Sequence, residues 1–232
     1  LEDFFKNPQS SSWKLSPDGQ WLAYMAPWKN RMNVFVRPTE GGEATRITSV
    51  EERDIGGYFW KGSERIIFLR DKGGNENFHL FSVSRKGGDV KELTPFEGVT
   101  TQIYDDLEDH PTDMLIGLNK RVAQVFDVYR IDTETGEMEM VVENPGNYTG
   151  YETDHEGVIR IANVTDGVNN TLMYRDTDED EFKEVLTTNF KETVSIQFFD
   201  FDNVKVYAMS NRGRDKLALV TMDPKTGEES EP

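Results

Sequence analysis

The clearest indication of the fold is the segment Trp13-Lys14-Leu15-Ser16-Pro17-Asp18-Gly19-Gln20-Trp21-Leu22-Ala23-Tyr24. Proline presets the φ angle of a turn, aspartate can bond the backbone that follows it, and glycine accepts a positive φ. Aromatic and aliphatic residues stand on both sides of this turn, as is typical of a β-hairpin. We therefore interpret the Pro17-Asp18-Gly19 tripeptide as a tight hairpin turn and assign no chemistry to it.

The same pattern returns along the chain. The first unit ends in Arg46-Ile47-Thr48 and the second in Glu92-Leu93-Thr94, so these two endings are expected to occupy the same place. The first turns of the five units lie near Asp18, Ser63, Thr112, Glu156 and Asn203. Their period of roughly 46 residues is in the range of propeller blades. Helical repeats share that period, but these runs are short and rich in β-branched and aromatic residues, which disfavours helices.

The repeat predicts an all-β fold, a β-propeller with about five four-stranded blades. The predicted blades span approximately residues 11–48, 55–94, 101–142, 148–186 and 194–229 of a single propeller domain or fragment, 1–232. The second strand of a unit, such as Ile66 to Leu69, is apolar on both faces, which fits a strand between two neighbouring sheets.

The fifth unit supplies three strands and a last turn, so we expect the chain to end inside a blade. A fragment of this kind exposes the face of a terminal blade and its strand edges. We therefore predict that the chain associates with itself through its end blades.

The charge of the chain limits its partners. Forty-three acidic and twenty-six basic side chains give a net charge of −17, which repels phosphate backbones and anionic lipid surfaces. We expect no nucleic-acid and no membrane partner, and the sequence shows neither a long apolar span nor a signal peptide. The compartment stays open between bacterial cytoplasm and periplasm. The absence of cysteine excludes disulfides, a thiolate nucleophile and Cys-ligated zinc.

Catalytic machinery is not evident in the sequence. The Gly-x-Ser-x-Gly motif of an α/β-hydrolase nucleophile does not occur. The histidines His79, His110 and His155 fall in three different repeats without a ligand spacing, so we interpret them as strand and turn residues. We assign no catalytic, cofactor-binding or metal-binding residue and expect no cofactor.

The acidic run from Asp176 to Glu181 has two interpretations. Alternating carboxylates suit a calcium ion, but the run lacks the glycine and the terminal bidentate glutamate of a calcium-binding loop. It also falls where the other repeats have their last hairpin turn. We therefore predict a solvated turn.

The stretch from Leu15 to Tyr24 resembles the blade signature of two groups of proteins. These are the Tol-associated periplasmic propellers and the amino-terminal propellers of the prolyl oligopeptidase family. The opening Leu1 to Pro8 and the stretches 51–55, 119–121 and 187–190 are more similar to the second group. Within it, they resemble bacterial acylaminoacyl-peptidases and dipeptidyl-aminopeptidase-like members.

The resemblance implies a propeller of about seven or eight blades that caps an α/β-hydrolase domain with a Ser-Asp-His triad and admits only short peptides. The chain would then be a non-catalytic propeller that gates and helps to bind short peptides. The hydrolase domain and the remaining blades would lie outside it, and the chain alone would not be an enzyme.

The resemblance also points to Glu51-Glu52, because some aminopeptidases of this family hold the amino terminus of the substrate with a pair of propeller glutamates. A charged linker between the first two blades is the alternative, and we favour it. Two other functions stay open at this stage: a free-standing protein-interaction propeller resembling the Tol-associated proteins, and a propeller enzyme such as a lyase or glycosidase with its site on the axis.

Overall fold

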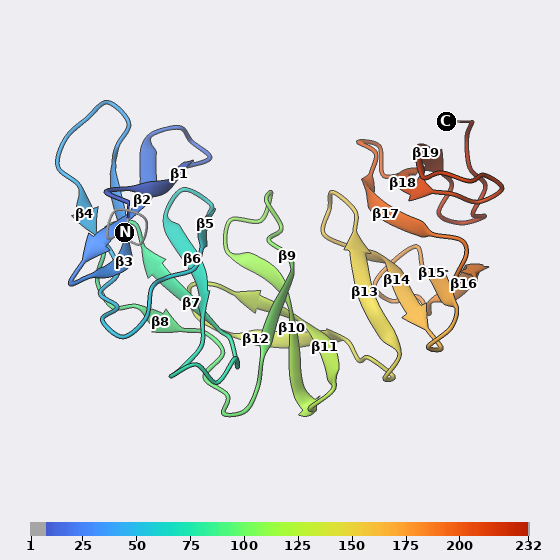
Figure 1. The fold of residues 1–232 in the computed structure, drawn as a ribbon, viewed down its shortest axis with the longest axis horizontal. Helices are drawn as coiled ribbons and strands as arrows, with labels where there is room; N and C mark the ends of the chain where they lie inside the picture. Colours follow the sequence, from blue (N-terminus) through green and yellow to red (C-terminus); the bar gives the residue numbers. More distant parts are fainter. Residues whose placement is uncertain (1–7, 232) are drawn as a thin grey trace, which may run out of the picture. The chain divides into compact units, whose positions relative to one another are not determined.

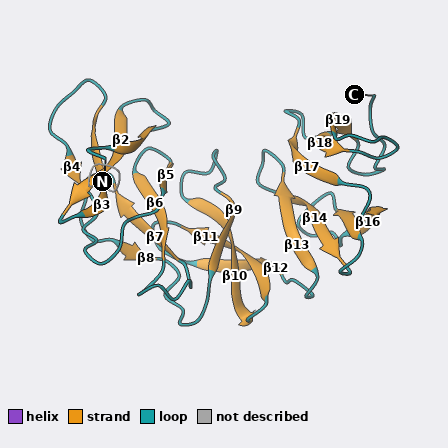
Figure 2. Ribbon diagram, in the orientation of Figure 1, coloured by secondary structure: helices purple, strands orange, loops and turns teal. Residues whose placement is uncertain are grey.

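The computed structural model describes residues 8–231, so most of the opening stretch that contributes to the resemblance lies outside the described residues. Within this range the chain forms strands, turns and loops and no helix (Figure 2). The described residues accordingly contain no helix long and apolar enough to cross a membrane. The predicted all-β class is confirmed.

The strands form five antiparallel sheets, and in each the order in space follows the order in the chain (Figure 1). Blade 1 contains β1 (Ser11–Leu15), β2 (Trp21–Trp28), β3 (Arg31–Pro38) and β4 (Thr45–Arg46). Blade 2 contains β5 (Tyr58–Lys61), β6 (Arg65–Arg70), β7 (His79–Ser84) and β8 (Lys91–Glu92). Blade 3 contains β9 (Thr101–Asp105), β10 (Asp113–Val122), β11 (Val125–Asp132) and β12 (Met138–Val142). These four-stranded meanders are the blades that the repeat predicts.

Blade 4 contains β13 (Tyr148–Thr153), β14 (Ile159–Thr165), β15 (Asn170–Tyr174) and β16 (Lys183–Thr188). Blade 5 contains β17 (Val194–Phe199), β18 (Val206–Ser210) and β19 (Ala218–Met222). Its sheet has three strands, as expected, and Glu229 adds only an isolated bridge to Met222.

The chain divides into two compact units. One unit runs to Ala123 and includes residues 129–139, whereas the other comprises residues 124–128 and the chain from Met140 onward. Blades 1 and 2 therefore lie in the first unit and blades 4 and 5 in the second, and each unit is described by itself.

The first hairpin turn forms as its residues dictate. The N–H of Gly19 donates to the carbonyl of Ser16 at 2.8 Å, and Gly19 has a φ of 71°. The Asp18 carboxylate accepts hydrogen bonds from the Ser16 hydroxyl at 2.6 Å and from the N–H of Gln20 at 3.0 Å. The hydrogen bond from Ser16 and the one from Gln20 lower the pKa of Asp18. The interpretation of the tripeptide as a tight turn is confirmed.

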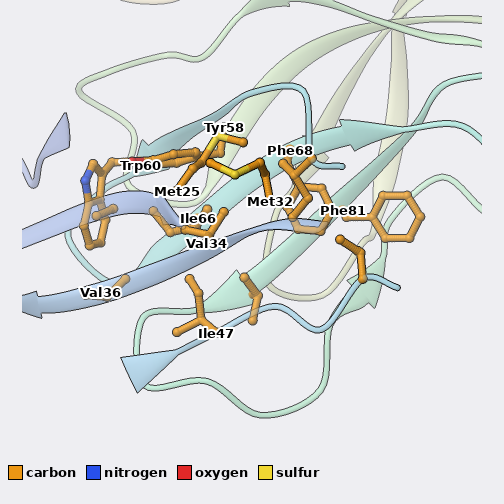
Figure 3. Close-up of a cluster of buried hydrophobic side chains, with 14 residues drawn as sticks. Met25, Met32, Val34, Val36, Ile47, Tyr58, Trp60, Ile66, Phe68 and Phe81 are labelled. Atoms are coloured by element: carbon orange, nitrogen blue, oxygen red, sulfur yellow. The ribbon is translucent and has the colours of Figure 1, made fainter. Parts of the chain in front are cut away.

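Blades 1 and 2 bury fourteen apolar side chains between them (Figure 3). We call the side of a blade that faces the next blade its downstream face and the opposite side its upstream face. Alternation along β2 sends Ala23 and Met25 to the downstream face of blade 1. On the upstream face of blade 2 they meet Ile66, Phe68 and other members of the cluster. Burial of each large side chain contributes about 1.5–3 kcal/mol.

The second strand of blade 2 is covered on both faces. Ile66 and Phe68 belong to the cluster with blade 1, whereas Ile67 between them belongs to a second cluster with Met114, Ile116 and other residues of blade 3. Ile66, Ile67 and Phe68 are each at most 1% exposed. The sequence predicts this burial from the continuous apolar run.

The second unit has its own core. One face of blade 5 packs on blade 4 through a cluster that includes Phe199, Val206, Val220 and Met222. In the strand registers, Phe199 of β17 is opposite Val206 of β18, which is opposite Met222 of β19. Val220 lies two positions before Met222, so all four side chains share one face of the sheet. That face is the upstream face of blade 5.

Hydrogen bonds between blades recur at the spacing of the repeat. The Tyr58 hydroxyl donates to the carbonyl of Ser12 at 2.5 Å, and the Trp60 indole N–H donates to that of Lys14 at 3.1 Å. Burial of its ring raises the pKa of Tyr58. One repeat further on, the Lys61 ammonium donates to the carbonyls of Asp106 and Leu107, and its burial lowers the pKa of the amine. First strands thus tie successive blades together.

The endings Arg46-Ile47-Thr48 and Glu92-Leu93-Thr94 make the same hydrogen bond in blades 1 and 2. The Thr48 hydroxyl accepts the N–H of Val34 at 2.9 Å, and the Thr94 hydroxyl accepts that of Leu80 at 2.8 Å. Both threonines are at most 2% exposed. The predicted equivalence of the two endings is confirmed.

Candidate functional site

A pocket of about 400 Å³ lies where the linker after blade 1 meets the loop between β6 and β7 of blade 2. It is lined by Glu52, Arg53, Arg70, Asp71, Lys72, Gly73 and Gly74. Three basic and two acidic side chains therefore surround it. This composition suits a polar or charged group.

The glycines of the pocket follow from the turn that they form. The N–H of Asn75 donates to the carbonyl of Lys72 at 3.3 Å, which closes a four-residue turn around Gly73 and Gly74. Both glycines have positive φ, at 66° and 82°. A turn with positive φ at both central positions favours glycine, because a Cβ atom is strained there.

Asp71 anchors the wall of the pocket. Its side chain is 2% exposed, and both carboxylate oxygens accept hydrogen bonds at 2.7 Å from Nη1 of Arg53. The backbone N–H of Glu76 also donates to this carboxylate, at 3.2 Å. A buried carboxylate needs such donors, because removing it from water is costly. The pair fixes the linker to the loop.

Lys72 connects the pocket to a buried histidine. Its ammonium lies 2.9 Å from the Glu92 carboxylate, which is also 2.5 Å from Nδ1 of His79. Partial burial raises the pKa of Glu92, but the hydrogen bonds from His79 and Lys72 outweigh it and lower the pKa overall. The imidazole is 6% exposed and is therefore shielded from a ligand.

Arg70 contributes a guanidinium group with a different environment. It lies 4.8 Å from the centre of the Phe81 ring, a cation–π contact. Within residues 8–231 it makes no ion pair. Its N–H groups are thus available to a carboxylate or a carbonyl of a ligand.

The structure separates the two glutamates singled out in the sequence. Glu51 turns away to Lys29, whose ammonium is 2.7 Å from its carboxylate, and both side chains are 55% exposed. An exposed pair of this kind contributes little to stability. Only Glu52 lines the pocket, beside three basic side chains. The two carboxylates therefore do not form one binding site in this structure.

The other histidines lie in turns. His110 is in the turn between β9 and β10, where its N–H donates to the carbonyl of Leu107 at 2.8 Å. His155 is in the turn between β13 and β14. Its Nε2 lies 3.1 Å from the carbonyl of Phe199, and its ring stacks on Phe201 at 5.7 Å. His79 lies in β7, as its strand pattern indicates.

The acidic run lies in the turn between β15 and β16. Lys225 lies 2.6 Å from Asp176, and the hydrogen bond from this lysine, followed by the one from Tyr174, lowers the pKa of Asp176. Arg175 pairs with Asp178. The run is therefore an exposed turn, as predicted, in which Asp176 and Asp178 have basic partners. No group of three or more acidic or histidine side chains placed to hold a metal ion occurs in the described part of the chain.

Sequence reasoning missed most of this pocket. Glu92 is 13 residues from His79 and 20 from Lys72, and nothing in the alternation of β7 indicates that the three side chains meet. The one available signal was the Asp71-Lys72-Gly73-Gly74 segment, whose two glycines mark a turn beside charged residues.

The sequence of the chain is similar to that of known peptidases over part of their length. No family model matches the chain. The chain is 32% identical to dipeptidyl aminopeptidase BIII of Pseudoxanthomonas mexicana over 96% of its own length and 33% of that protein. It thus spans about a third of the length of the curated relatives it matches.

Solved structures give the same architecture. A prolyl endopeptidase is similar over 98% of this chain and 37% of its own, with a TM-score of 0.69 at 12% identity. A putative TolB from Agrobacterium tumefaciens is similar over 95% of this chain and 79% of its own, with a TM-score of 0.54 at 13% identity. The chain is therefore a β-propeller segment. Its resemblance to the amino-terminal propeller of prolyl oligopeptidase family peptidases, drawn from the sequence, is confirmed.

Proposed function

We propose that the chain is a non-catalytic propeller that gates, and helps to bind, short peptides for a serine peptidase whose α/β-hydrolase domain lies outside it. The observation that carries the proposal is the 32% identity to a dipeptidyl aminopeptidase over 96% of this chain. The likeness of the fold to a prolyl endopeptidase supports it.

The chemistry of the pocket is consistent with binding rather than catalysis. Arg70 and Lys72 can donate hydrogen bonds to a carboxylate or to peptide carbonyls. His79, which Glu92 links to the pocket, is buried, and its Nδ1 is engaged by the Glu92 carboxylate rather than by a nucleophile. Arg53 and Lys72 are paired with carboxylates, whereas Arg70 makes no ion pair within residues 8–231, so the pocket favours the carboxylate end or the carbonyls of a peptide at Arg70.

The test compares this chain with the longer gene product that carries a hydrolase domain. Both are given dipeptidyl and acylated short-peptide chromogenic substrates, together with a fluorophosphonate probe that labels reactive serines. We expect cleavage and labelling of the longer product only. Hydrolysis by this chain alone would contradict the assignment of a non-catalytic role.

Binding is tested separately by nuclear magnetic resonance of this chain with short peptides. Shifts at residues 52–53 and 70–74 are expected, and Arg70→Gln should reduce them. Arg121→Gln, at an exposed position of β10 in blade 3 and outside the pocket, is the matched control. Unchanged spectra with all peptides would remove the binding part of the proposal.

The glutamate pair needs its own variant. Glu51→Gln should leave cleavage of substrates with a free amino terminus unchanged in the longer product, because Glu51 is engaged by Lys29 and lies outside the pocket. A large rise in KM for those substrates, with acylated substrates unaffected, would assign the amino-terminal site to the pair instead.

A second candidate is a free-standing propeller that holds another protein. The similarity to a putative TolB, which extends over 79% of that chain, favours it. If no gene product carrying this chain is labelled by the serine probe, this candidate replaces the first.

A further inference from the structure

A second pocket, of about 300 Å³, lies between blades 4 and 5, at the end of the sheets where β13 and β17 begin (Figure 1). Both blades belong to the same compact unit. The walls of the pocket are the downstream face of blade 4, the linker after β16 and the first strand of blade 5. It is therefore a space between two neighbouring blades, and it is separate from the pocket at Arg70, which lies in the other unit.

The apolar pattern of the repeat is broken in this pocket at Asn163. This residue follows the buried Ile161 by two positions, on the face that packs on blade 5. The equivalent residues, Met25 in blade 1 and Leu69 in blade 2, belong to the apolar clusters with the next blade. Asn163 is half-buried and lines the pocket instead, and its amide has no hydrogen-bond partner within residues 8–231. A partly buried amide of this kind favours a polar ligand.

The strand beside Asn163 leaves space for a ligand. Gly150 of β13 is opposite Asn163 in the register of β13 with β14. A Cβ atom at position 150 would lie 3.7 Å from Nδ2 of Asn163, so the glycine keeps this side of the amide open. Val194 and Ile196 of β17 supply an apolar part of the opposite wall.

Two hydroxyl groups of the lining are arranged to accept hydrogen bonds. The Thr149 hydroxyl donates to the carbonyl of Asn163 at 3.2 Å, and the Thr188 hydroxyl donates to that of Asn170 at 3.3 Å. Because a hydroxyl has a single donor and two acceptor lone pairs, each of them offers a ligand only acceptor capacity. The pocket therefore suits a ligand that is rich in hydrogen-bond donors.

The charges of the lining are negative. They belong to Glu152 and Glu192, and none of the described residues that line the pocket is basic. Glu152 is opposite Ile161 in the register of β13 with β14, which places it on the same face as Asn163. Two carboxylates without a basic side chain among them favour a cation.

Asn211, in the loop between β18 and β19, fixes the linker that carries Glu192. Its side-chain amide donates to the carbonyl of Lys191 at 3.2 Å, and its side-chain carbonyl accepts the N–H of Thr193 at 2.6 Å. The backbone N–H of Asn211 also donates to the carbonyl of Thr193 at 3.2 Å. The backbone is thus held on both sides of Glu192, which lowers the cost of ordering this side of the pocket when a ligand binds.

We propose that this pocket binds the guanidinium group of an arginine side chain in a polypeptide ligand. A guanidinium group has a positive charge and several N–H donors in one plane and no acceptor, which matches a lining of carboxylates and accepting hydroxyls. An ammonium group has fewer donors and is hydrated more strongly. The inference goes beyond the proposed function, because the site lies in blades 4 and 5 and requires no hydrolase domain.

The test uses peptides with an acetylated amino terminus and an amidated carboxyl terminus, so that the central side chain carries the only charge. The ligand is acetyl-Ala-Arg-Ala-amide. Its control contains citrulline, in which a neutral urea of the same shape replaces the guanidinium group. In nuclear magnetic resonance titrations of this chain, the arginine peptide should shift the signals of residues 149–152, 163 and 192–196. The citrulline peptide should bind about tenfold more weakly.

Variants of the lining test the assignment. Glu192→Gln should raise the dissociation constant of the arginine peptide about fivefold. Asn163→Leu introduces the residue type of position 69 and should abolish binding without lowering the midpoint of thermal unfolding. Glu179→Gln removes the same charge from an exposed position in the turn between β15 and β16, outside the pocket, and should bind like the unchanged chain.

Four outcomes would overturn the inference. The arginine and citrulline peptides bind equally or not at all, or Glu192→Gln and Glu179→Gln weaken binding equally, which indicates attraction to the acidic chain as a whole. A lysine peptide that binds more tightly than the arginine peptide would contradict the choice of a guanidinium group. An Ala-Ala-Ala peptide with a free amino terminus that binds as tightly would assign the pocket to an amino terminus instead. None of these outcomes depends on labelling of the longer product by the serine probe.

Discussion

Blades 1 and 2 are built from the same local sequence pattern and differ in what covers them. Tyr24 and Phe35 in blade 1 occupy the positions of Phe68 and Phe81 in blade 2, and both pairs are stacked. The pair in blade 2 is buried, whereas the face around the pair in blade 1 is open to solvent. The difference shows that a blade's sequence specifies its sheet, while the neighbouring blade decides how much each side chain contributes to stability.

The strongest test of this comparison is truncation of the two aromatic pairs. Phe68→Ala should lower the free energy of unfolding by about 3–5 kcal/mol, because it leaves a cavity in a packed core. Tyr24→Ala should cost only about 1 kcal/mol, since its ring is partly solvated already. Urea denaturation at low micromolar concentration measures both. Equal losses would show that the two faces are equally covered.

The two threonine endings should respond alike. Thr48→Val and Thr94→Val each leave a buried backbone N–H without its acceptor, that of Val34 or of Leu80. We expect each to cost about 1–3 kcal/mol in urea denaturation. Thr45→Val, at an exposed position of β4, is the control and should change stability little. A loss of stability in only one of the two variants would contradict the equivalence of the two threonine endings.

The hairpins between the second and third strands differ in the residues that adopt positive φ. Blade 2 uses Gly74, with φ of 82°, and blade 1 uses Asn30, with φ of 62°. Gly74→Ala should cost about 1 kcal/mol, because alanine is strained in this region. Gly56→Ala, where φ is not positive and no atom is near the new Cβ, should cost nothing by thermal unfolding. Similar losses for both would show that the turn is not strained.

The smallest effect concerns one position of the fourth strand, which is Glu92 in blade 2 and Arg46 in blade 1. The pKa of Glu92 in the folded chain is below its ordinary value of 4.5. Its contribution to stability is therefore present above that value and is lost as the pH falls through the folded pKa. Glu92→Gln should be less stable than the unchanged chain near neutral pH and equal to it in strong acid.

Arg46→Gln provides the comparison for this titration. An arginine stays charged throughout the acidic range, so its effect on stability should not change as Glu92 titrates. Urea denaturation at several pH values distinguishes the two. A Glu92→Gln effect that is constant with pH would show that the carboxylate is not stabilised by His79 and Lys72.

The sequence predicted the blade as a unit because its determinants are local. The turn at Pro17-Asp18-Gly19 forms from the φ preferences of its own residues, and the buried β6 follows from an unbroken apolar run. The endings at Thr48 and Thr94 were matched by their position in the repeat alone. Each of these features depends on residues near in sequence or on the period itself.

The candidate site could not be predicted in the same way. Its lining comes from a linker, the end of β6 and a loop, and its charges connect to β7 and β8 across 13 to 20 residues, as in His79 with Glu92 and Lys72 with Glu92. The sequence singled out Glu51 and Glu52 because they are adjacent. The structure sends one to Lys29 and the other into the pocket, because the linker bends at residues 51–53 and turns the two adjacent side chains in different directions.

An all-β repeat of antiparallel blades without a cysteine or a hydrolase nucleophile motif could be predicted from the residues alone, since periodicity and composition are readable without contacts. Which charged residues meet around the pocket, which histidine is buried and which blade faces are covered could be learned only from the folded chain. Those properties depend on the distances between side chains from different strands and blades, and only the packed fold determines these distances.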